Sequence, residues 1–183
     1  MSHSPTRDQL VALANNNPSD PMGFLEGLSP IHAAWHQETL RTYGFLLFHH
    51  RVVRYFNTIV VPAVQPAVTA FTGAQLTAMD VQPFGGSTQG VDTLGGLATF
   101  SSGLESWHNT AHMRIGMATG APMMDPSQNI FFRPFWQLHL YIDQFFQTVL
   151  QQYATKAHPN QFLTADSAAG HIEASHHGWV PRI

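Results

Sequence analysis

The chain is 183 residues long, which fits one domain with a buried core. Its formal net charge of −3 offers neither a basic field for nucleic acid nor a polybasic membrane patch, so we expect neither partner. The absence of cysteine excludes disulfides, thiolate metal sites and cysteine nucleophiles. Histidine, with 12 residues, outnumbers lysine and arginine together, with 8. This excess of imidazoles needs an explanation.

No targeting or membrane segment is evident in the sequence. Met1–Ser19 is largely polar and lacks the apolar stretch of a secretory signal. The longest apolar run, Ile59–Val68, is interrupted by Pro62 and Pro66 and is too short to span a bilayer. We therefore expect a cytoplasmic protein.

Three helices are expected in the first third of the chain. The first covers Thr6–Leu13 and is stopped by the Asn15–Pro18 run. Ser29-Pro30 has the form of an N-cap followed by a proline in the first turn. It predicts a second helix that ends near Gly44, and a third helix follows over Phe45–Val61.

The rest of the sequence predicts a long connection, two further helices and a tail. Residues 72–103 are rich in Gly, Thr and Ser, which indicates a long connection with room for short strands. A helix is expected from near Ser102 to Gly120, with Glu105 in its first turn. A long helix over Phe131–Ala157 follows, and residues 158–183 have the pattern of an extended tail.

These elements predict one domain over residues 1–183 of the mainly α class. Four main helices with moderate links favour an antiparallel four-helix bundle core over about residues 30–157, with long loops and an extended C-terminal tail over 158–183. In such bundles, metal sites are built from side chains that point inward from facing helices.

Two histidine pairs with helical spacing dominate the chemistry of the sequence. Residues four apart on a helix share a face, so both members of a pair can reach one ion. Each pair is followed downstream by one more helical histidine, which gives two sets of three: His32, His36 and His49, then His108, His112 and His139. Six neutral nitrogens without thiolate or carboxylate suit copper better than iron, manganese or magnesium. A single zinc ion is the simpler alternative, but it would use only three of these residues.

The same residues carry a resemblance to the type-3 copper proteins, which are the tyrosinases, catechol oxidases and arthropod haemocyanins with their phenoloxidase relatives. The run Phe135–Asp143, FWQLHLYID, with Phe146 after it, resembles the arthropod pattern F-W-x-x-H-x-Y-I-D-x-x-F. Trp107–His112, WHNTAH, with Gly116 four residues on, resembles H-N-x-x-H-x-x-x-G. Phe45–Asn57 is similar to the first copper half and, in that register, selects His49 rather than His50.

The resemblance covers about residues 30–60 and 102–150 and implies roles for further residues. It implies two copper ions held by the six histidines, with dioxygen bridging the pair as a substrate. By the same resemblance, Phe135 would stack on a ligand ring, and Asp143 would hold a ligand imidazole or an arginine. Asn109 would help to orient a water near the substrate, with Glu105 as its partner.

The expected function is that of a short type-3 copper oxidase. It would use dioxygen to convert a small aromatic substrate (an o-diphenol, an o-aminophenol or a monophenol) to a quinone-type product, because the chain has no spare domain to plug the site. The alternative is a haemocyanin-like protein that binds dioxygen or copper without turnover. The sequence leaves open the individual substrate, a homo-oligomer, a copper-delivery partner, and the roles of His50, His171, His176 and His177.

Overall fold

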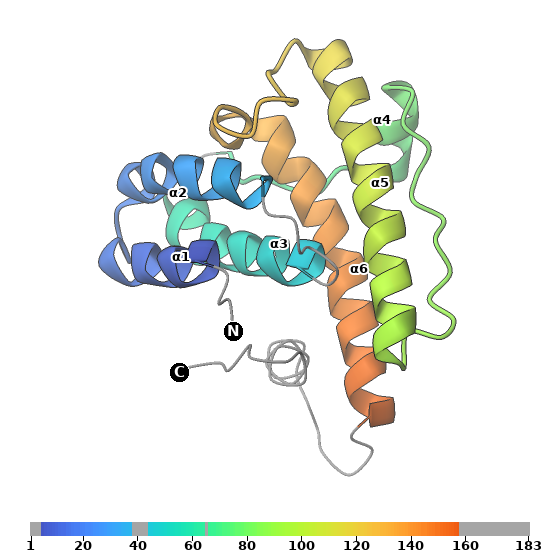
Figure 1. The fold of residues 1–183 in the computed structure, drawn as a ribbon. Coiled ribbons are helices and arrows are strands. Elements are labelled where there is room, and N and C mark those ends of the chain that lie inside the picture. Colours follow the sequence, from blue (N-terminus) through green and yellow to red (C-terminus); the bar gives the residue numbers. More distant parts are fainter. Residues whose placement is uncertain (1–4, 38–43, 65, 158–183) are drawn as a thin grey trace.

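The structure is a computed structural model that describes residues 5–37, 44–64 and 66–157 (Figure 1). The described part is mainly α and contains no strand. Its α-helices are α1 (Pro5–Asn16), α2 (Pro21–Trp35), α3 (Gly44–Tyr55), α4 (Gly73–Ala78), α5 (Leu94–Thr119) and α6 (Arg133–Ala157). Three short segments complete it: the π-helix η1 (Phe56–Val60) and the 3-10 turns η2 (Val61–Ala63) and η3 (Asn129–Phe131). The predicted tail over 158–183 lies outside the described residues.

Helix α2 begins earlier than predicted. Its N-cap is Asp20, whose carboxylate accepts a 3.0 Å hydrogen bond from the Gly23 N–H, and Pro21 occupies the first turn. The prediction of a start at Ser29-Pro30 was wrong, because the same cap-and-proline signal is present nine residues upstream and Pro30 lies inside the helix. The helix ends at Trp35 rather than near Gly44, so His36 is its C-cap residue.

Helix α5 also begins earlier than the predicted start near Ser102. Thr93 is the N-cap, and its hydroxyl accepts a 3.0 Å hydrogen bond from the Gly96 N–H. The glycines of this first part disfavour a helix. However, Leu97, Phe100 and Leu104 recur at helical spacing and are buried, and this burial outweighs the propensity. Glu105 therefore lies within the helix rather than in its first turn.

The described residues 66–93 of the connection contain no strand, whereas the sequence left room for short strands within 72–103. The connection holds α4 instead, which a capping box between Thr72 and Gln75 opens. The indole N–H of Trp107 donates a 2.7 Å hydrogen bond to the Gln82 carbonyl and fixes the connection against α5. No helix in the described part is long and apolar enough to cross a membrane.

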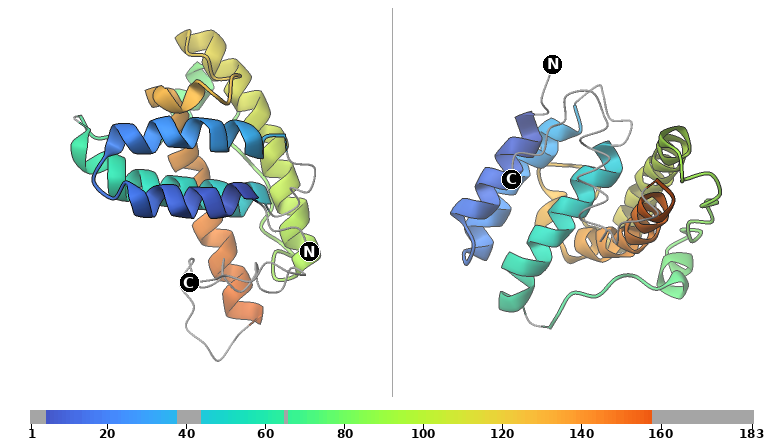
Figure 2. Two further views of the ribbon diagram at one scale, coloured as in Figure 1. Left: turned by 60° about the vertical axis from the view of Figure 1, so that its left-hand side comes forward. Right: turned by 90° about the horizontal axis from the view of Figure 1, so that it is seen from below.

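The helices form two antiparallel groups that run crosswise (Figures 1 and 2). Successive helices alternate in direction in the first group, α1 to α3, and α5 and α6 form a long antiparallel pair beside it. A simple antiparallel four-helix bundle is therefore not confirmed. The Phe56 ring stacks on Trp136 with centroids 3.8 Å apart and an interplanar angle of 7°, which joins η1, directly after α3, to α6. The core also includes Leu10 and Phe24 of the first two helices, so it starts before residue 30.

Gly95 and Gly96, adjacent in the first turn of α5, provide a matched test of how residue 90 packs against this helix. A Cβ at Gly96 would lie 1.7 Å from the Gly90 carbonyl oxygen, whereas a Cβ at Gly95 meets nothing within 4 Å. We expect Gly96→Ala to lower the free energy of unfolding by about 1–3 kcal/mol. Gly95→Ala should raise it by up to about 1 kcal/mol through helix propensity. Urea denaturation of both variants measures the difference, and equal effects would contradict the close approach of residue 90 to α5.

Candidate metal centre

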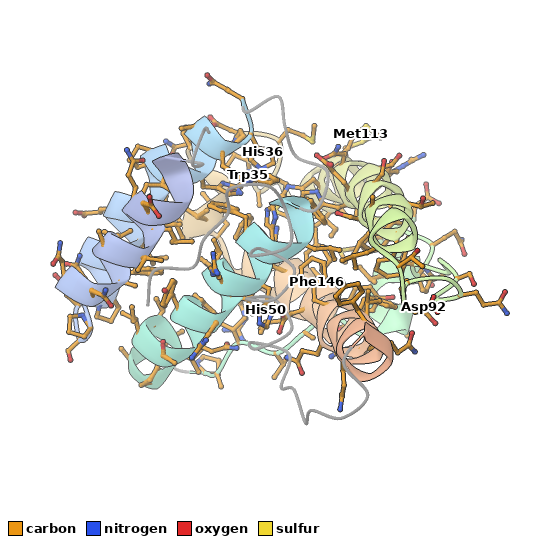
Figure 3. The ribbon with its side chains drawn as sticks, turned by 60° about the horizontal axis from the view of Figure 1, so that its bottom comes forward. Trp35, His36, His50, Asp92, Met113 and Phe146 are labelled. Carbon is orange, nitrogen blue, oxygen red and sulfur yellow. The ribbon has the colours of Figure 1, made fainter. Side chains whose placement is uncertain are left out.

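The structure brings all six predicted histidines together between the two helix groups. His32 lies in α2 with His36 at its C-cap, His49 lies in α3, His108 and His112 lie in α5, and His139 lies in α6. Five of them have side chains that are between 0 and 5% exposed. His36 is half-buried and lies beside Trp35 at the end of α2 (Figure 3). It is the member of the set closest to solvent.

Two overlapping groups of these histidines can hold a metal ion. One consists of His32, His36 and His49, and the other of His49, His108 and His139. Within each group the ligand nitrogens all lie within 4.8 Å of one another. The first group has the members predicted from the sequence. The second group contains His49 in place of the predicted His112. The centroid of the His112 ring nevertheless lies 4.2 Å from that of His108.

Backbone carbonyls fix the tautomer of four of these imidazoles. A carbonyl oxygen only accepts hydrogen bonds, so each Nδ1 that contacts one must carry the proton. The Nε2 lone pair is then available to a metal, as metal-binding histidines require. The four bonds run from His32 Nδ1 to Pro126 O (2.9 Å), His49 Nδ1 to Phe45 O (2.9 Å), His112 Nδ1 to Met123 O, and His139 Nδ1 to Phe135 O (2.7 Å).

The inward nitrogens fit a metal in two respects. The Nε2 atoms of His49 and His112 are buried without a hydrogen-bond partner, a costly arrangement that a metal ion would relieve. The Nε2 atoms of His36 and His32 lie 3.1 Å apart, and those of His108 and His139 lie 3.2 Å apart. Two nitrogens bound to one ion at 2.0–2.1 Å lie roughly 3.3 Å apart in tetrahedral geometry. The observed spacings are close to that value.

Burial keeps the imidazoles neutral. Desolvation lowers the pKa of His32 to about 3 and the pKa of His112 to about 4. It also lowers the pKa values of His49, His108 and His139 well below 6.5, and neighbouring imidazoles add to each of these shifts. A metal ligand must be deprotonated at Nε2. These side chains therefore meet the requirement at neutral pH before any ion arrives.

Phenylalanines one turn before His49 and His139 pack on the cluster in equivalent ways. Phe135 stacks on His139 with ring centroids 3.8 Å apart and also touches His32 edge-on at 5.3 Å. Phe45 packs on His49 at 4.5 Å and on His108 at 4.8 Å. Each phenylalanine thus contacts imidazoles from both helix groups. The ring contact that the resemblance implied for Phe135 is present, and the matching contact of Phe45 was missed.

The loop between α5 and α6 holds one histidine from each helix group. Its Met123 carbonyl accepts from His112 of α5, and its Pro126 carbonyl accepts from His32 of α2. The Asn129 side-chain amide also donates to the Met123 carbonyl, at 3.1 Å. Sequence reasoning missed this loop because a backbone acceptor has no residue signature.

The remaining predicted site residues lie around the cluster. The side-chain oxygen of Asn109 is 3.2 Å from His108 Nδ1, and this exposed residue lies at the edge of the site. Glu105 is half-buried one turn earlier on α5. Asp143 does hold an imidazole, but that imidazole belongs to His50, which is not among the six.

No family model, curated protein or solved structure matches the chain in the three comparisons made.

The burial of neutral imidazoles predicts an acid-sensitive metal-free protein. Between pH 6.5 and the lowered pKa values of about 3 for His32 and about 4 for His112, the unfolded chain binds protons that the folded chain excludes. The free energy of unfolding of the metal-free protein is therefore highest above pH 6.5 and falls as the pH drops below that value. As the pH falls, His32 and His112 should each lower the free energy of unfolding by up to about 1.4 kcal/mol per pH unit. Urea midpoints measured from about pH 8 to pH 5 test this; constant midpoints would contradict it.

Proposed function

We propose that the chain is a type-3 dicopper oxidase that uses dioxygen to oxidise small phenolic substrates. The observation that supports this most is the convergence of six imidazoles from two helix groups in one buried cluster. The motifs quoted above for their resemblance to type-3 copper proteins contain His49, His108, His112 and His139, and the His32/His36 pair supplies the other two. The two copper ions would be held by His32, His36 and His49 on one side, and by His108, His112 and His139 on the other.

The donor set favours copper over zinc. Imidazole suits both metals, but for a given nitrogen site the affinity of divalent copper exceeds that of zinc. A structural zinc ion is usually closed by four ligands, often thiolates, and the chain has no cysteine. One zinc ion would also leave part of the cluster as buried nitrogens without a partner. Two ions account for the whole set.

The residues around the ions would perform three tasks. The carbonyl-bound Nδ1 atoms hold His32, His49, His112 and His139 in the tautomer that leaves the Nε2 lone pair for a metal ion. Phe45 and Phe135 exclude water from the interior and limit ring rotation. When bound, the copper pair would supply the electrons that reduce dioxygen and the oxidising equivalents for the substrate.

Substrate would approach at the edge marked by His36, because the other five histidines are almost completely buried. Asn109 lies at an exposed position next to His108, so it and Glu105 remain the candidates for orienting a water there. For an o-diphenol the overall reaction balances with two substrate molecules per dioxygen. Four electrons and four protons pass to oxygen, and the products are two quinones and two waters.

A dioxygen carrier without turnover is the second candidate. It is favoured by the depth of the site, since His32, His49 and His139 are 0% exposed. A diatomic gas reaches such a position more easily than an aromatic ring does. The two candidates share the copper centre and differ in product formation.

Copper content tests the centre without any substrate. His139→Ala removes a ligand nitrogen that both the predicted set and the observed second group contain. We expect it to reduce bound copper from two ions per chain to one or none. Gln144→Ala, at an exposed position on the same helix, is the matched control and should keep two. Elemental analysis after dialysis gives the counts. One zinc ion or no metal in the wild-type chain would defeat the proposal.

Oxygen consumption tests the reaction. The copper-loaded protein should take up oxygen with catechol or o-aminophenol faster than the same concentration of free copper, and quinone-type products should accumulate. Zinc-loaded protein is the control and should be inactive. Reversible oxygen uptake without product would support the carrier instead.

A further inference from the structure

His50 and Asp143 form a buried pair that the metal centre does not use. His50 Nδ1 lies 2.6 Å from Asp143 Oδ1, and the residues are 7% and 6% exposed. His50 belongs to α3 and Asp143 to α6, so the hydrogen bond joins the two helix groups. In Figure 3, His50 lies on α3 where that helix runs next to α6. The other carboxylate oxygen of Asp143 accepts a 2.8 Å bond from Gln147 of its own helix.

Stability alone does not explain such a pair. Removing a carboxylate from water is costly, and apolar residues of similar volume in place of a buried pair are often equally stable or more so. A directional hydrogen bond, however, specifies how two packed helices are placed along each other in a way that apolar contacts do not. The best-attested use of buried polar pairs is to fix register.

The pair is placed next to the contact where the two metal groups meet. His50 directly follows His49, and Asp143 lies one turn after His139. The rings of His49 and His139 stack across α3 and α6, with centroids 5.0 Å apart and an interplanar angle of 21°. His49 also belongs to both groups of ligand nitrogens. In the proposed centre His49 would hold one ion and His139 the other, so a slip of α3 along α6 would change the distance between the two metal positions.

We propose that His50 and Asp143 are positioning residues, and that their hydrogen bond sets the separation of the two metal ions. The inference rests on the proposed dicopper function, because it concerns the spacing within that centre. Neither side chain binds a metal in this role. The bond acts through His49 and His139, whose helices it holds in register.

Electron paramagnetic resonance of the protein loaded with divalent copper tests the inference. Two closely coupled divalent copper ions give no signal, whereas separated ions do. The variants are Asp143→Leu and the double variant His50→Phe with Asp143→Leu, which replaces the whole pair by apolar side chains. Gln147→Ala is the matched control, because it removes the second partner of Asp143 but leaves the bond between the helices. Copper content and thermal midpoint are measured in parallel.

We expect the double variant to keep two copper ions and a thermal midpoint near that of the wild type, yet to gain a signal that accounts for most of its copper. Gln147→Ala should stay silent. A double variant that is folded, loaded with two ions and silent would overturn the inference while leaving the proposed function intact. The inference would also be overturned, with the proposed function intact, if Asp143→Leu alone gains a signal while the double variant stays silent and regains the wild-type thermal midpoint. A wild-type protein whose two copper ions give a full signal would overturn both.

Discussion

The candidate centre depends on the burial of imidazoles whose Nδ1 atoms bond to the backbone, and two of these rings, His49 and His112, have an Nε2 atom without a hydrogen-bond partner. Four backbone carbonyls hold protons on Nδ1, so the lone pairs of His32, His49, His112 and His139 face the interior. Desolvation keeps these rings uncharged. Burying the unpartnered Nε2 atoms of His49 and His112 costs folding free energy. A metal ion bound to them would relieve this cost and so stabilise the fold.

The two helix groups supply this centre in similar ways. Each contributes a pair of histidines four residues apart, and then a third histidine whose Nδ1 bonds to the carbonyl of a phenylalanine one turn earlier. Phe45 and Phe135 then pack on rings from the opposite group as well as their own. The cluster is thus also a packing contact between the two helix groups.

Much of this could be predicted from the sequence, since helical spacing determines which histidines share a face. The mainly α class followed from the expected helices, and a histidine cluster that could hold a metal ion followed from the spacing of the histidines. The starts of α2 and α5 could not be predicted in this way. Ser29-Pro30 has the sequence of a helix start although Pro30 lies inside α2. The glycines after Thr93 disfavour a helix, although Leu97, Phe100 and Leu104 form a buried stripe on α5. The crosswise arrangement of the helices and the partner of Asp143 depend on contacts between distant segments, which local patterns do not encode.

The loop between α5 and α6 reaches the centre through its main chain alone. Any amino acid presents the same carbonyl oxygen at positions 123 and 126. The two hydrogen bonds therefore constrain the backbone path of this loop and not the side chains at these two positions. What limits the amino acid at position 123 is therefore its packing, since the Met123 side chain is buried, rather than its hydrogen bond to a histidine.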